Sequence, residues 1–217
     1  MNTLEYIVAK WSLDIGPQAR MPVEIPNAGR ETLADLFREL EFKAGAEIGV
    51  KRGDYSAMLC ERNPQATIYG VDPYKQYDDY PDVVYQDGFD SWRVDMKVRM
   101  APYPNFRPIK KFSMVAVKQF EPGSLDFVYI DANHTLRYVT EDIVEWAKVV
   151  RPGGIVAGHD YSLNKPHGEA PHVQVVEAVN AYVSAYWIRP WFVLGRKSET
   201  DPAAIRDRPR SWMFVKP

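Results

Sequence analysis

Short apolar runs and longer amphipathic segments alternate along most of this chain, and the alternation predicts its architecture. The apolar runs have the length of buried strands and are bounded by turn residues, whereas the segments between them carry apolar residues at helical spacing. This order of strands and helices is typical of a doubly wound α/β sheet. We expect strands at 44–48, 67–71, 106–110, 125–130 and 155–157, and helices at 32–41, 55–62, 89–101, 140–150 and 173–187.

The N-terminal part of the chain has a different pattern. Apolar side chains at helical spacing predict a short helix over 2–14. The stretch 16–27 contains several prolines and predicts an extended linker. We therefore expect an N-terminal helix and linker over 1–28, followed by one domain over 29–217.

Composition narrows the class of protein. A length of 217 residues suits one α/β domain, and a net charge of −2 gives no reason to expect nucleic acid, which usually selects a basic surface. The N-terminus lacks the apolar core of a signal peptide and no apolar run approaches membrane-spanning length, so we expect no membrane partner and a cytoplasmic location by default. Cys60 is the single cysteine, which excludes an intramolecular disulfide and suits a reducing compartment.

The stretch from Ala44 to Asp72 predicts a strand, a glycine-bearing turn, a helix and a second strand that ends in an acid. Gly49 and Gly53 allow the backbone to bend sharply and to approach a ligand closely, and Asp72 can accept both hydrogen bonds of a ribose diol. The G-x-G-x-x-G pattern of dinucleotide folds is incomplete, and Glu47 would repel a pyrophosphate but suits an ammonium group. An ordinary βαβ unit with turn glycines is the alternative interpretation.

Two more predicted strands end in acids and histidines. One apolar strand is followed by Asp131 and His134, and a Pro-Gly-Gly turn leads into a second one that is followed by His159 and Asp160. Adjacent strands lie about 4.8 Å apart and parallel strands end at the same edge of a sheet. These side chains are therefore expected to converge on one small ion or substrate group.

Together, these motifs resemble those of the class I S-adenosylmethionine-dependent methyltransferases. The glycine-bearing turn is similar to motif I of that family, and the Pro-Gly-Gly segment is similar to the entry to its fifth strand. The segments IDANH and GHDY look like the subgroup of sugar and small-molecule O-methyltransferases, and the similarity runs from about residue 30 to residue 197. The resemblance implies a Rossmann-like, mostly parallel seven-stranded sheet, with 191–194 and 212–215 as its terminal antiparallel strand pair.

The resemblance also implies a cofactor site. S-adenosylmethionine carries a ribose, an adenine and a methionyl amine but no phosphate, which suits the acids of the first motif. Ser113 lies at the start of a predicted helix, where the family usually contacts adenine, and Asp131 has a second interpretation as a partner of the cofactor's amino group. The predicted cofactor-binding residues are Glu47, Gly49, Gly53, Asp72, Ser113 and Asp131.

Relatives of this kind commonly hold magnesium with acids or amides at the positions of Asp131, His159 and Asp160. Magnesium prefers oxygen ligands, so the histidine favours manganese, iron or zinc, or no metal. In the alternative interpretation, the His159–Asp160 pair bonds loop backbone and shapes the pocket without a metal.

His134 is the candidate general base, because it lies where related enzymes carry a base and an imidazole titrates near neutral pH. Asp131 is the second catalytic candidate. The alternative for His134 is a histidine that caps a helix or pairs with an aspartate.

The predicted function is methyl transfer from S-adenosylmethionine to a small polar acceptor, with a hydroxyl as the favoured acceptor group. The rival functions are a nucleotide-sugar or NAD-dependent Rossmann enzyme and a non-catalytic cofactor-binding protein. The tyrosine- and aspartate-rich loop 74–85 is interpreted either as a substrate lid or as an ordinary surface loop. The acceptor and the oligomeric state stay open.

Overall fold

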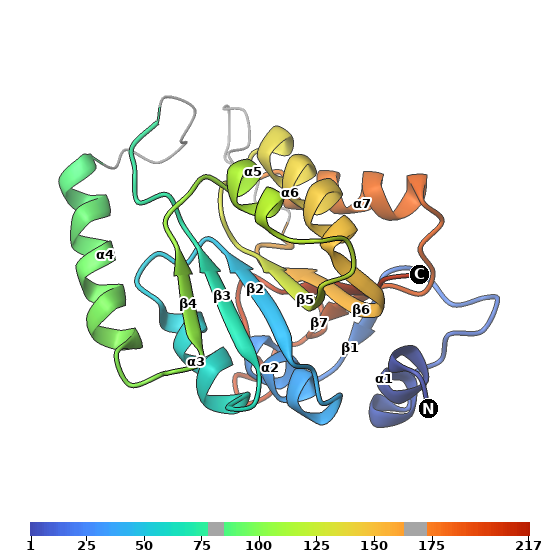
Figure 1. Cartoon of the computed structure of the whole chain (residues 1–217). Coiled ribbons are helices and arrows are strands. Elements are labelled where there is room, and N and C mark those ends of the chain that lie inside the picture. The colour runs from blue at the N-terminus through green and yellow to red at the C-terminus, as the bar shows by residue number, and fades with distance from the viewer. Residues whose placement is uncertain (78–84, 163–172) are drawn as a thin grey trace.

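The computed structural model describes residues 1–77, 85–162 and 173–217, and it contains an eight-stranded sheet with helices on both faces (Figure 1). Most of the predicted lid and the histidines at 167 and 172 lie outside the described residues. The helices are α1 (Thr3–Trp11), α2 (Arg30–Glu39), α3 (Asp54–Arg62), α4 (Gln86–Met100), α5 (Ser113–Ala116), the short 3-10 helix η1 (Val117–Gln119), α6 (Leu136–Val149) and α7 (Val175–Ala185). The strands are β1 (Val23–Ile25), β2 (Ala44–Ile48), β3 (Thr67–Val71), β4 (Phe106–Ile109), β5 (Leu125–Ile130), β6 (Val150–Gly158), β7 (Phe192–Leu194) and β8 (Trp212–Val215).

The sheet has the strand order β1-β7-β8-β6-β5-β2-β3-β4. β8 is antiparallel to both of its neighbours, β6 and β7, and every other adjacent pair is parallel. The predicted doubly wound sheet with a terminal antiparallel pair is therefore confirmed. Within the described residues, no helix has both the length and the apolarity needed to cross a membrane.

The number of strands differs from the prediction, because the expected linker over 16–27 contains a strand. β1 pairs in parallel with β7, and the amide of Val23 donates to the carbonyl of Trp191 at 2.9 Å. Pro22 and Pro26 flank this strand rather than interrupt it, so no hydrogen bond of the ladder is lost. Its last residue, Ile25, is fully buried, and the sheet has eight strands instead of seven.

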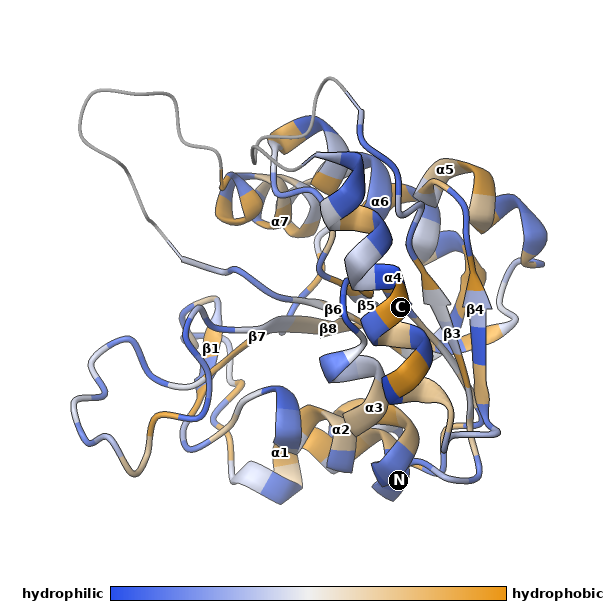
Figure 2. Cartoon of the chain, turned by 90° about the vertical axis from the view of Figure 1, so that its left-hand side faces the viewer, coloured by the Kyte–Doolittle hydropathy of each residue, from blue (hydrophilic) through white to orange (hydrophobic). Residues whose placement is uncertain are grey.

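Successive residues of the central strands face opposite helix layers, as the period of two requires. In β5, Val128 and Ile130 pack in the core beneath α6 and α7. Phe127 and Tyr129 pack in the second core, which includes buried residues of α1, α2, α3 and α4. In Figure 2, α6 and α7 lie above the sheet and α1, α2 and α3 lie below it. The carboxyl ends of the strands remain open at one edge.

Several element boundaries also differ from the prediction. α2, α4 and α6 begin two to four residues before their predicted starts. β6 begins at Val150 rather than at Ile155, because the Pro-Gly-Gly turn is itself paired: the amide of Gly153 donates to Lys216, and the amide of Lys216 donates to Gly154. α7 ends at Ala185, two residues before the predicted end, and Trp187 is 83 % exposed.

Candidate active site

A cavity of about 620 Å³ lies at the carboxyl ends of β2, β3, β5 and β6. This is the edge at which open α/β sheets bind their ligands. The cavity is lined by the predicted site residues Glu47, Gly49, Asp72, Ser113, Asp131, His134, His159 and Asp160, but not by Gly53.

Glu47 lies near the end of β2 and is almost completely buried. The hydroxyl of Ser56, in α3, donates a hydrogen bond to its carboxyl group. Burial raises the pKa of Glu47, the bond from Ser56 opposes the rise, and the charge of Asp131 adds to it, so that the pKa is about 8. Glu47 therefore carries a proton at neutral pH, and a cationic group beside it would favour its ionisation.

The two glycines of the first motif have separate structural roles. Gly49 has a φ of 96°, and a Cβ atom there would lie 2.1 Å from the carbonyl oxygen of Asp131. The close approach that Gly49 permits is therefore made by the chain's own loop after β5. Gly53 has a φ of 79° and precedes α3, where a Cβ atom would lie 3.3 Å from Met96 and Met100 of α4. It shapes the turn and the helix packing outside the cavity.

Asp72 follows β3 and is held by two backbone amides. Its Oδ2 accepts a hydrogen bond from Lys51 at 2.9 Å, and its Oδ1 accepts one from Tyr74 at 2.8 Å. Burial raises the pKa of Asp72, and hydrogen bonds from backbone amides oppose that rise. Since a carboxylate has about four acceptor positions, Asp72 can still accept hydrogen bonds from a ligand diol.

Ser113 belongs to a buried polar group that motif reasoning missed. Its hydroxyl donates to Asp142 and accepts a hydrogen bond from Nε1 of Trp146 at 2.8 Å. Asp142 lines the cavity and is 3 % exposed, and its burial raises its pKa to about 7. Both partners belong to α6. Their spacing is that of the buried face of this helix, so the sequence does not distinguish them from ordinary core residues.

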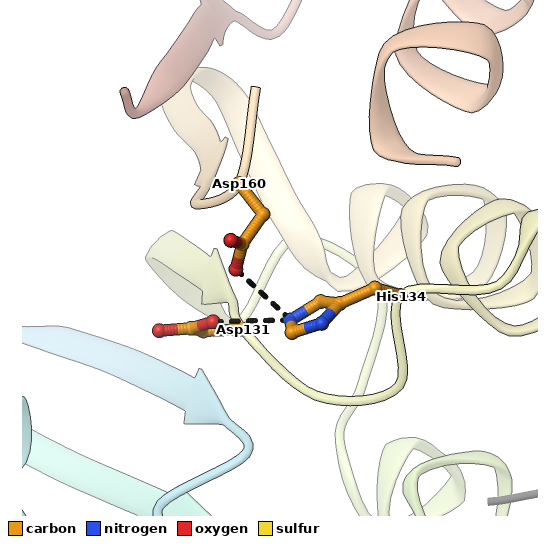
Figure 3. A group of neighbouring side chains, drawn as sticks. All are labelled: Asp131, His134 and Asp160. Atoms are coloured by element: carbon orange, nitrogen blue, oxygen red, sulfur yellow. Dashed lines mark hydrogen bonds and ion pairs between the residues drawn. The ribbon is translucent and has the colours of Figure 1, made fainter. Parts of the chain in front are cut away.

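Asp131, His134 and Asp160 come together at the ends of β5 and β6 (Figure 3). Nε2 of His134 lies 3.0 Å from Oδ2 of Asp160 and 3.4 Å from Oδ1 of Asp131. Burial opposes a charge on His134, but the hydrogen bonds with the two aspartates outweigh it and raise its pKa to about 10. The two histidines hold the pKa of Asp160 far below its usual range, against the effect of burial. In this arrangement His134 is a cation between two carboxylates.

His159 lies beside this group and is 7 % exposed. Its Nδ1 is 3.2 Å from Oδ2 of Asp160 and 3.9 Å from Oδ1 of Asp131, while its Nε2 faces Asp207 at 3.4 Å. Burial works against a charge on His159, but these carboxylates raise its pKa to about 9. Both histidines that the sequence singled out therefore contact the same pair of acids.

Aromatic side chains also line the cavity. The ring of Tyr77 contacts Phe112 edge-on at 5.5 Å and Tyr138 at 5.8 Å between centroids. Its hydroxyl accepts a hydrogen bond from Nδ2 of Asn133 at 3.1 Å, and burial is the main cause that raises its pKa to about 12. Arg30, at the start of α2, also lines the cavity, with its Nη1 3.9 Å from Oδ2 of Asp131. Tyr77 lies in the tyrosine-rich loop and Asn133 in the IDANH segment that the sequence singled out, whereas Arg30 and Tyr138 belong to no motif.

The acids and histidines could hold a divalent cation. Ligand atoms of Asp131, His134 and Asp160 lie within 4.8 Å of one another, and among the described residues this is the group that brings such atoms together. The predicted set contained His159 in place of His134, and the Nδ1 of His159 also faces both acids. Two carboxylates and an imidazole suit manganese, iron or zinc better than magnesium, so the donor chemistry fits a metal of that kind.

Comparisons with solved structures give the same fold. The O-methyltransferase TomG from Streptomyces achromogenes, in complex with SAM, has a TM-score of 0.59 and 16% identity over 98% of this chain and 87% of its own. An O-methyltransferase from Bacillus cereus, in complex with SAH, has a TM-score of 0.59 and 15% identity over 99% and 90%. An rRNA methylase from Streptococcus thermophilus has a TM-score of 0.58 and 13% identity over 85% and 94%. At these identities the likeness concerns the fold alone and leaves the acceptor undecided.

Sequence comparisons give the family. No curated protein matches the chain in sequence. A family model described as a methyltransferase domain matches residues 46–161, which run from the middle of β2 past the end of β6 and include all the strand-end acids and histidines of the cavity. Because this match covers more than half of the 217 residues, the predicted family is confirmed and the protein belongs to the methyltransferase domain family.

Proposed function

We propose that this protein transfers a methyl group from S-adenosylmethionine to a hydroxyl group of a small molecule. The observation that carries the proposal is one continuous cavity of about 620 Å³, which joins Glu47 near the end of β2 and Asp72 after β3 to the histidines and acids after β5 and β6. One end thus offers partners for a cofactor, and the other offers groups that can orient an acceptor and take its proton. Two structural neighbours are described as O-methyltransferases in complex with SAM or SAH, which supports a cavity that holds both the cofactor and a hydroxyl acceptor.

At the cofactor end, each polar group of S-adenosylmethionine has a candidate partner. Glu47 would pair with the ammonium group, and Asp72 would accept hydrogen bonds from the ribose hydroxyls. The Ser113–Asp142 pair would contact the adenine, and the rings of Tyr77, Phe112 and Tyr138 would provide an apolar surface for this flat base.

At the acceptor end, the chain's residues would position the hydroxyl and move its proton. In-line displacement at a sulfonium requires little covalent help, so orientation and proton removal provide most of the rate. Because His134 is a cation between Asp131 and Asp160, it would take the hydroxyl proton only in its neutral form, so a rate that depends on it would rise with pH towards its pKa of about 10. A divalent ion held by Asp131, Asp160 and a histidine would lower the pKa of a bound hydroxyl.

The rival dinucleotide function fits this cavity less well. Glu47 occupies the first motif, and the close approach at Gly49 is already taken by the carbonyl of Asp131. A pyrophosphate would have to lie against Glu47. In the dinucleotide fingerprint it lies instead against a glycine turn that no other part of the chain contacts.

Calorimetry and a transfer assay test the proposal together. We expect S-adenosylhomocysteine to bind in the micromolar range and NAD not to bind. With S-adenosylmethionine labelled in its methyl group, we expect the label to pass to a member of a panel of phenols, sugars and other hydroxyl compounds. Binding of NAD without the adenosyl thioether would reject the cofactor, and transfer only to amines or to RNA would reject the acceptor class.

A further inference from the structure

We propose that a cavity between α4 and the edge strand β4 is a second ligand site, which binds a small organic anion with an apolar body. This cavity has a volume of about 360 Å³, within the range of roughly 300–1,000 Å³ for small-molecule sites. β4 is the last strand in the order of the sheet, and Figure 1 shows α4 beside it. The site is distinct from the larger cavity of about 620 Å³ that carries the proposed methyl transfer.

One face of α4 forms a wall of this second cavity. Arg93, Met96, Lys97, Met100 and Ala101 all line it, and they follow one another at the spacing that places side chains on one side of a helix. The two methionines are almost completely buried, whereas Lys97 is exposed. The wall therefore has an apolar interior and a charged rim, an order that suits an anionic head group on an apolar body.

The rest of the lining is also mostly apolar. Val50 and Phe106 are buried there, and Tyr103 is half-buried. The packing around Gly70 is close, because a Cβ atom there would lie 2.4 Å from the ring of Phe106 and 2.9 Å from Val50. Methionine side chains are flexible and make favourable contacts with aromatic rings. The interior therefore favours an aromatic body.

The charged side chains of the cavity determine the sign of the ligand. Arg93, Lys97 and Lys110 line it, and its described lining residues include no aspartate or glutamate. Within the part of the chain that the structure describes, none of these three cations forms an ion pair. By contrast, Arg99 of the same helix lies 2.7 Å from Asp54. Arg93 and Lys97 are like charges four residues apart, which destabilises a helix slightly, and a bound anion would offset this effect.

Val50 and Tyr74 separate the second cavity from the larger one. Val50 lines both cavities, whereas Tyr74 lines only the second. The hydroxyl of Tyr74 donates to the carbonyl of Lys51 at 2.9 Å, and its amide donates to Asp72 at 2.8 Å. Because these hydrogen bonds hold Tyr74 in place, we expect the two sites to be occupied independently.

Nuclear magnetic resonance on the whole protein, labelled with ¹³C in its methionine methyl groups, tests the proposal. The chain has 7 methionines, of which Met96 and Met100 line the second cavity and Met114 lines the larger one, so the signals identify the occupied site. Single Met→Leu variants assign these three signals. The probes share one aromatic ring and differ in charge: benzoate and phenyl phosphate are anions, benzyl alcohol is neutral and benzylamine is a cation.

We expect at least one anion to shift the signals of Met96 and Met100 with a Kd of about 1 mM or tighter. The tighter of the two anions identifies the head group as a carboxylate or a phosphate. Benzyl alcohol and benzylamine should bind at least about tenfold more weakly, because they lose the attraction of three cations. The shifts should persist in saturating S-adenosylhomocysteine.

Lys97→Gln and Lys110→Gln should each weaken binding of the anion by about two- to fivefold, the range for partly exposed charge pairs. Lys111→Gln is the matched control, because Lys111 is an exposed neighbour that lines neither cavity, and it should leave the affinity unchanged. Equal affinity for benzyl alcohol, unshifted Met96 and Met100, or an equal loss in Lys111→Gln would overturn the proposal. So would shifts confined to Met114, or displacement of the anion by S-adenosylhomocysteine.

The anion titration needs neither a methyl acceptor nor a bound cofactor. If the proposed methyl transfer failed, the signals of Met96 and Met100 would still report on the second cavity. If those signals stayed unshifted, the transfer assay would be unaffected. The two proposals therefore fail separately.

Discussion

At the scale of single residues, the hydrogen-bond partners of each buried acid decide whether it carries a charge. Glu47 and Asp142 each receive a side-chain hydrogen bond from one hydroxyl, and burial raises their pKa values to about 8 and about 7. Asp160 is also largely buried, but two histidines lower its pKa. A hydroxyl is a weak partner for a carboxylate and an imidazolium is a strong one, so acids of one cavity hold their protons differently.

Asp142 should make stability depend on pH. Its pKa is about 7 in the folded protein and 3.8 as the ordinary value, so the unfolded chain loses this proton first as the pH rises. The contribution of Asp142 to the free energy of unfolding is therefore complete below about pH 4. It decreases by at most about 1.4 kcal/mol per pH unit and is lost as the pH rises to about 7. Asp142→Asn keeps an acceptor for Ser113 without a titrating group, so it should gain stability relative to the native protein over this range.

Urea unfolding at several pH values measures this difference without cofactor. Asp95→Asn is the control, because Asp95 is an exposed aspartate of α4 and does not line the cavity. A constant difference between Asp142→Asn and the native protein from pH 4 to pH 7 would show that Asp142 does not hold a proton in the fold.

His134→Ala should lower the turnover rate by about 10²–10⁴-fold, the usual contribution of general-base catalysis. Affinity for S-adenosylhomocysteine should change little, because His134 contacts Asp131 and Asp160 and touches neither Glu47 nor Asp72, the partners proposed for the ammonium group and the ribose. Single-turnover kinetics on an identified acceptor provide the measurement. Full turnover in the variant would assign proton removal to another group, such as Asp131.

At the scale of elements, the central strands were predictable and the edge was not. β3 and β5 have the predicted boundaries, because each is a mostly apolar run between turn residues, with Asp126 as the one charged residue. β1 escaped prediction because three residues between prolines carry no periodicity, and its strand character comes from pairing with β7. Sequence patterns describe local preference, whereas an edge strand is defined by its neighbour.

The same distinction applies to the site. Acids and histidines after the strands were identified because parallel strands end at one edge, which the structure confirms for Asp131, His134, His159 and Asp160. Asp142 and Asp207 could not be identified in this way. One lies within the buried stripe of α6 and the other in a polar connector, and only tertiary packing brings them to the cavity and to His159.

Ile25 tests whether the N-terminal segment is part of the folded unit. It is fully buried at the end of β1, in the core that also contains residues of α2 and α3. Ile25→Ala should lower the free energy of unfolding by about 2–5 kcal/mol, the range for a large core side chain. Val94→Ala, on the exposed face of α4, should change it by less than about 0.5 kcal/mol. Equal small effects in urea unfolding would mean that residues 1–28 contribute little to the fold.

At the scale of the whole molecule, distant parts of the chain meet at the active site. The start of α2 provides Arg30, the central strands provide the acids and histidines, and the connector before β8 provides Asp207. The sheet order makes the meeting possible, because β6 lies between β5 and the antiparallel β8.

Metal removal tests the chemistry of the assembled site. If Asp131, Asp160 and a histidine hold a divalent ion, EDTA should abolish methyl transfer, and manganese, iron or zinc should restore it at least as well as magnesium. Elemental analysis before and after chelation identifies the ion. Full transfer in EDTA by metal-free protein would leave these residues to orient the acceptor and to move its proton.

The buried proton of Glu47 has a consequence for the protein's response to its surroundings. If the cofactor's ammonium group pairs with Glu47, the carboxyl group must ionise, and each binding event releases up to one proton below its pKa of about 8. The heat measured for S-adenosylhomocysteine should then depend on the ionisation enthalpy of the buffer, with a slope that disappears in Glu47→Gln. Affinity should increase with pH, by no more than about tenfold per unit, until Glu47 is already ionised. A slope of zero in the native protein would place the ammonium group elsewhere. If the slope is as expected, occupancy of the cofactor site would depend on the pH of the compartment in which the protein works.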